Sequence, residues 1–133
     1  RDPLATVPSQ LSSIAPALKL SGFTAIAVSV RDRFVALLAF YYEHLAAFGS
    51  CHADAVAMLD HSGLHGRLAE SVAVAYRRLG LSVGAQFQQS LQVADRQSRS
   101  FRSGHRYRLS DYGLSEEGIR ARFAKGHAHV SAR

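Results

Sequence analysis

The stretch RDPLATVPS, residues 1–9, places an arginine and a serine on either side of a proline-containing turn that is expected to lead into a helix. The arginine guanidinium is a planar, permanently charged fork that matches two phosphate oxygens at once. A serine near a helix start adds a hydroxyl beside backbone N–H groups that have no partner within the helix. Arg1 and Ser9 are therefore candidate ligands of a phosphate group.

A second stretch, HRYRLSDYGLSEEGIR at residues 105–120, guides how the first is interpreted. Together the two resemble the PAPS-dependent sulfotransferases of bacterial type, where PAPS is 3'-phosphoadenosine-5'-phosphosulfate. The first stretch is similar to the family's R-[DN]-P-x-x-x-x-x-S run, which holds the 3'-phosphate, and the second to its C-terminal H-[KR]-Y-x-L-x-x-[FY]-G-L run. RRLGL at residues 77–81 is a weaker similarity. The resemblance covers Arg1 to about Phe123 and only the C-terminal half of the family.

This resemblance implies an α/β fold related to the P-loop nucleoside triphosphate hydrolases. The chain would be a mostly helical C-terminal fragment of that fold, with one or few strands. In the intact enzyme a sulfuryl group would pass directly from PAPS to an acceptor hydroxyl or amine. The glycine-rich loop for the 5'-phosphosulfate and the catalytic base would precede Arg1, so this portion is expected to contain no catalytic residue and to be inactive alone. The sequence leaves the acceptor and the oligomeric state open.

The resemblance implies two further contacts with the nucleotide. His61 occupies the place of a family tyrosine that packs near the adenine, and one hypothesis is that it stacks on the purine instead. A basic, glycine-containing loop also touches the 3'-phosphate in this family, and Arg102, Ser103, Gly104 and His105 are the candidate residues here. The alternative for this loop is an ordinary solvated basic segment.

Composition favours one folded piece without a metal. The chain has 133 residues, of which 47% are apolar, and residues 1–133 are expected to form a single partial domain with a frayed tail at 125–133. Because Cys51 is the only cysteine, no intramolecular disulfide can form, and a cytoplasmic location is expected. No apolar run long enough for a membrane segment is apparent. His61 and His65 lack the cysteines or carboxylates that would complete a zinc site.

Charge is distributed unevenly along the chain. Up to Asp95 there are seven basic and seven acidic residues, whereas from Arg96 onward nine basic residues accompany three acidic ones. Such a basic segment also fits an alternative function, a helical nucleic-acid-binding or protein-interaction module without catalysis. Against nucleic acid, no recognition motif is present, and aromatic residues do not alternate with the arginines beyond Phe101 and Tyr107.

Apolar spacing predicts the secondary structure. Helical periodicity runs from Pro3 to Leu18, where the prolines predict a short first turn, a helix from about Ser9 and a disruption near Pro16. Helical periodicity also appears across residues 23–48, in 68–79 with Gly80 as its end, and in 83–94 after a Ser82 cap. The run AVAML at residues 55–59 is predicted to be a buried strand. Ser115 is predicted to cap a final helix, with Glu116 and Glu117 in its first turn.

Overall fold

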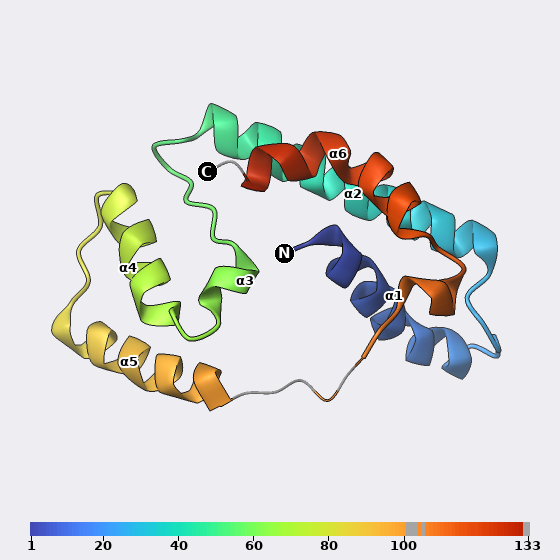
Figure 1. Cartoon of the computed structure of the whole chain (residues 1–133), viewed down its shortest axis with the longest axis horizontal. Coiled ribbons are helices and arrows are strands. Elements are labelled where there is room, and N and C mark those ends of the chain that lie inside the picture. The colour runs from blue at the N-terminus through green and yellow to red at the C-terminus, as the bar shows by residue number, and fades with distance from the viewer. Residues whose placement is uncertain (101–103, 105, 132–133) are drawn as a thin grey trace. The chain divides into compact units, whose positions relative to one another are not determined.

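The computed structural model describes residues 1–100, 104 and 106–131, and these residues form helices but no strand (Figure 1). The elements in chain order are α1 (Pro3–Leu20), α2 (Val28–Cys51), α3 (His61–Leu64), α4 (Leu68–Arg78), α5 (Ala85–Ser100), the 3-10 helix η1 (Leu109–Tyr112) and α6 (Glu116–Ser131).

The expected α/β fold is wrong for the described residues, which are helical or irregular throughout. The segment predicted as a strand, residues 55–59, is a turn followed by irregular backbone. A strand must pair its N–H and C=O groups with a neighbouring strand, and none lies beside it in the part described. The apolar side chains of Val56 and Met58 in this segment pack instead against Gly49 near the end of α2.

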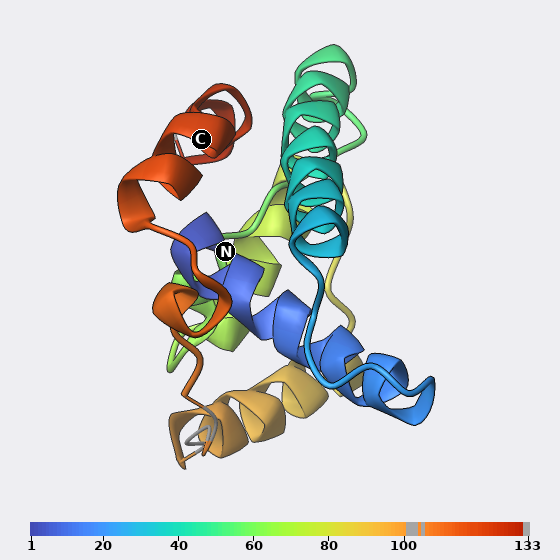
Figure 2. The ribbon, with the colours of Figure 1, turned by 90° about the vertical axis from the view of Figure 1, so that its right-hand side faces the viewer.

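One compact unit consists of residues 1–47 and 105–133. Helix α1 packs against η1 and α6, as Figures 1 and 2 show. Apolar side chains from α1, α2, η1 and α6 form its core: Val7, Leu11, Val35, Ala39, Leu109, Ile119 and Phe123. Residues near both ends of the sequence therefore share one hydrophobic cluster.

Helix α1 begins at Pro3, so both the predicted start at Ser9 and the predicted disruption near Pro16 are wrong. Proline suits the first turn of a helix, where its missing N–H would have had no partner. Pro8 lies farther inside the helix, yet its ring is fully buried in the core. This burial offsets part of the cost of the hydrogen bond that proline cannot make.

Helix α2 confirms the long helix predicted over residues 23–48, although it starts five residues later and continues past Gly49. Val35, Ala39 and Ala46 are buried, whereas large apolar side chains on the remaining surface stay open to solvent. The most exposed of those between Leu37 and Phe48 are Leu37, Phe40, Tyr41, Leu45 and Phe48, at 44–58% of their full area. By length and composition α2 could cross a membrane, but core helices of soluble proteins meet the same criteria.

A second compact unit consists of residues 48–104, in which α4 packs against α5. Ala75 and Leu91 are buried. The predicted end of α4 at Gly80 is confirmed, because Gly80 adopts a φ of 67° just after the helix, a region where glycine is favoured. Helix α5 begins at Ala85, three residues beyond the predicted Ser82 cap.

Candidate functional site

The N-terminal turn of α1 is closed by Asp2. Its carboxylate accepts a hydrogen bond from the Leu4 amide at 2.8 Å, and its backbone carbonyl accepts from the amides of Ala5 and Thr6 at 3.1 and 2.9 Å. Pro3 has no amide hydrogen to donate. The first amides of α1 therefore already have acceptors, and a phosphate at this position would depend on side chains.

Tyr42 of α2 fixes the backbone at this end of α1. Its hydroxyl donates to the Arg1 carbonyl at 2.6 Å and lies 3.0 Å from the Thr6 hydroxyl oxygen. The ring meets Phe123 edge-on, with 5.1 Å between the centroids. Burial raises the pKa of Tyr42 above its usual value, and the charge of Asp2 adds to this, while the Thr6 hydrogen bond opposes it. The hydroxyl thus stays protonated and remains a donor.

The Arg1 side chain is exposed, and its guanidinium makes no hydrogen bond or ion pair with the described residues. The contact from Tyr42 engages only the Arg1 carbonyl. Backbone anchoring combined with an uncommitted guanidinium is what an arginine needs to bind an anion from solution.

Ser9 lies six residues beyond Pro3, about 9 Å farther along the helix axis at the usual rise per residue. It is half-buried, and its backbone carbonyl accepts a hydrogen bond from the Ser12 hydroxyl at 2.8 Å. The argument that placed Ser9 beside free amides at a helix start does not hold, because α1 starts earlier. The structure does not bring Arg1 and Ser9 together at the first turn.

The second stretch folds into η1, a glycine turn and α6. Gly113 follows η1 with a φ of 63°, and the Arg31 guanidinium donates to the Tyr112 carbonyl at 2.9 Å across this turn. Ser115 accepts a hydrogen bond from the Gly118 amide at 3.1 Å, which confirms the predicted cap of the final helix.

The two stretches that carry the resemblance meet in the core of the first unit. From the stretches themselves, Val7, Leu109 and Ile119 belong to this core, and Leu11 of α1 and Phe123 of α6, which lie just beyond the stretches, belong to the same cluster. All five are buried, and Val7 and Leu11 are completely inaccessible. Sequence reasoning identified both stretches, but it missed Tyr42 and Arg31, which link them to α2.

The remaining predicted nucleotide contacts are His61 and the residues of the basic loop, Arg102, Ser103, Gly104 and His105. His61 is exposed at the first residue of α3, with its ring 5.5 Å from that of His65. Gly104 is exposed, whereas Arg102, Ser103 and His105 lie outside the described residues. His61 belongs to the second unit and Arg1 to the first. Within the described part, no group of three or more histidine, cysteine or acidic residues could hold a metal ion.

No family model, no curated protein and no solved structure matches this chain. The resemblance to the sulfotransferases therefore rests on the two stretches themselves.

Proposed function

We propose that this chain forms the nucleotide-binding part of a PAPS-dependent sulfotransferase, with Arg1 as ligand of the 3'-phosphate. The observation that supports this most is the shared core of the two motif stretches. Residues 1–9 and 105–120 are far apart in the sequence, yet their apolar side chains are buried together. If the two stretches resembled the family only by chance, there would be no reason to expect them to pack on one another.

The hydrogen bonding of Arg1 supports the same proposal. The Tyr42 hydroxyl holds the backbone of Arg1, and the guanidinium is uncommitted among the described residues. A phosphate bound there would accept charge-assisted hydrogen bonds from the guanidinium. Because Asp2 occupies the Leu4 amide, the arginine side chain has to supply most of the affinity.

In the intact enzyme, the sulfur–oxygen bond to the nucleotide phosphate breaks as a new bond to the acceptor oxygen or nitrogen forms. The acceptor loses its proton to a base, and the bisphosphate nucleotide leaves. The role proposed for this chain is to fix the nucleotide by its 3'-phosphate, so that the sulfuryl group is held in line with the acceptor. No described residue is assigned to the transfer itself.

Isothermal titration with adenosine 3',5'-bisphosphate tests the role of Arg1. Charge-assisted hydrogen bonds contribute about 1.5–3 kcal/mol, so we expect Arg1→Gln to weaken binding about tenfold or more. Arg33→Gln is a matched control, because Arg33 is an exposed arginine on α2 in the same unit, and it should leave the affinity near that of the unmodified chain. Equal affinities of the two variants would overturn the assignment.

A protein-interaction module is the second candidate, and one observation favours it. Leu37, Phe40, Tyr41, Leu45 and Phe48 expose large apolar areas on α2. Contiguous exposed apolar surface is typical of regions that contact another macromolecule. A chain that bound neither the bisphosphate nor DNA would support this candidate over the sulfotransferase.

A further inference from the structure

A hollow of about 460 Å³ opens between α4, α5 and the segment that joins them. Ala73 of α4, Val83 of the joining segment and Leu91 of α5 supply apolar lining. Arg77, Ser82, Gln88 and Gln92 supply polar groups. The volume lies within the range of sites for small molecules, which are mostly apolar with a few polar groups that orient the ligand.

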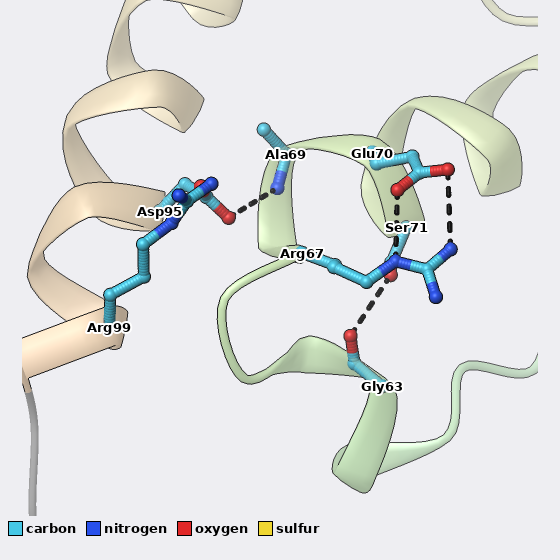
Figure 3. A network of polar contacts seen from close by, with 7 residues as sticks. All are labelled: Gly63, Arg67, Ala69, Glu70, Ser71, Asp95 and Arg99. Atoms are coloured by element: carbon cyan, nitrogen blue, oxygen red, sulfur yellow. Dashed lines mark hydrogen bonds and ion pairs between the residues drawn. The ribbon is translucent and has the colours of Figure 1, made fainter.

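Among the described residues that line the hollow, Glu70 is the only one with an anionic side chain, and it is already paired. Glu70 binds Arg67 through two contacts, Nε to Oε2 at 3.0 Å and Nη2 to Oε1 at 3.3 Å (Figure 3). The hydrogen bond from Arg67 lowers the pKa of Glu70, and the charge of Arg77 acts in the same direction. Arg67, which does not itself line the hollow, offsets the negative charge of Glu70, so the positive charge of Arg77 is left to attract an anion.

The remaining polar groups are available to a ligand. The side chains of Arg77, Ser82, Gln88 and Gln92 make no hydrogen bond with the residues that the structure describes. The guanidinium can bind a carboxylate through two parallel hydrogen bonds, and the amides and hydroxyl can act as donors or acceptors.

The helices that form the hollow are fixed to each other at one end. Asp95 of α5 accepts a hydrogen bond from the Ala69 amide in the first turn of α4 at 3.4 Å (Figure 3). Arg99 binds the same carboxylate at 2.7 Å. This contact positions α4 against α5, so the hollow is formed before a ligand arrives, which lowers the cost of binding.

We propose that this hollow binds a small organic carboxylate, with Arg77 as the ligand of the carboxylate and Ala73, Val83 and Leu91 packed against the apolar body. The proposal is independent of the phosphate site, because every residue that lines the hollow belongs to the second unit. Either site can fail its test without affecting the other.

Nuclear magnetic resonance titration of the full chain with naphthalene-2-carboxylate tests this proposal. We expect amide shifts at Ala73, Ser82 and Gln92, and weaker binding of the neutral naphthalene-2-carboxamide. Arg77→Gln should weaken binding of the carboxylate about tenfold or more. Arg78→Gln is the matched control, since Arg78 is the exposed neighbour and does not line the hollow.

Arg77→Lys separates charge from geometry, because it keeps the positive charge and loses the planar fork. We expect its affinity to lie between those of the unmodified chain and Arg77→Gln. Absence of binding, equal affinity for the acid and the amide, or equal loss in the Arg77→Gln and Arg78→Gln variants would overturn the proposal. Far-ultraviolet circular dichroism of each variant verifies that the helices are retained.

Discussion

Asp95 is a buried carboxylate at the contact of α4 with α5. The Arg99 hydrogen bond lowers its pKa below the ordinary value, burial opposes this, and the Ala69 amide adds to the lowering. A carboxyl group whose pKa is lowered in the folded state stabilises that state above its unfolded pKa. This contribution is lost as the pH falls through the lowered folded pKa.

Replacement of Asp95 should therefore have a pH-dependent effect. We expect Asp95→Asn to lower the urea midpoint most near neutral pH, with the difference from the unmodified chain shrinking below about pH 4. Urea titrations of both proteins across this range measure it. Asp54→Asn, at an exposed position in the same unit, should leave the midpoint almost unchanged. A difference that grows on acidification would contradict the ion-pair explanation.

At the scale of single residues, the sequence predicted local contacts better than distant ones. Ser115 could be recognised as a cap because its partner Gly118 is three residues away. Tyr42 gave no such signal, since its hydroxyl meets Arg1 across 41 positions. Arg31 likewise contacts the Tyr112 carbonyl across 81 positions. Contacts of this kind depend on how helices pack, which a single sequence does not encode locally.

Among the helices, α6 approaches α2 closely at Gly126. A Cβ atom at this position would lie 2.6 Å from the Glu43 amide nitrogen and 2.8 Å from the Tyr42 Cβ. Both distances are shorter than atoms tolerate, and backbone cannot yield as a flexible side chain does. The absence of a side chain at residue 126 therefore permits this contact between the helices.

We expect Gly126→Ala to lower the free energy of unfolding by about 1–3 kcal/mol, because it overpacks the α6–α2 contact. Chemical denaturation measures the change. Gly118→Ala is the control within the same helix, since its new Cβ would meet only the Ser115 hydroxyl at 3.1 Å and alanine favours helix by about 1 kcal/mol. If Gly118→Ala lowered the free energy of unfolding more than Gly126→Ala does, the close approach of α6 to α2 would not explain the loss of stability.

Element prediction succeeded where periodicity was long and failed where the run was short. α2 shows apolar positions over many turns, so its helical period was unambiguous. The five residues at 55–59 are too few to show a helical or strand periodicity. A short apolar run of this kind fits either a strand or a segment that covers a helix end. The start of α1 was predicted too late for a different reason, because the sequence alone does not show that the ring of Pro8 is buried.

On the scale of the whole molecule, the excess of six positive charges after Asp95 is shared between the two units. In the described part of this segment, Arg99 forms an ion pair with Asp95 and Arg120 forms one with Glu116. The nucleic-acid alternative depends on this excess, whereas the sulfotransferase proposal depends on Arg1 at the other end of the sequence. Because DNA binding and nucleotide binding would depend on different residues, we expect their affinities to respond differently to salt.

Duplex DNA bound through several arginines releases many counterions, so its affinity should fall by about 10³ or more between about 50 and about 200 mM salt. Adenosine 3',5'-bisphosphate engages few charges at Arg1, and its affinity should fall much less over the same range. We therefore expect the bisphosphate to be the tighter ligand at the higher salt, as measured by fluorescence anisotropy for DNA and calorimetry for the nucleotide. DNA binding that persists at the higher salt, with weak binding of the bisphosphate, would favour the nucleic-acid module instead.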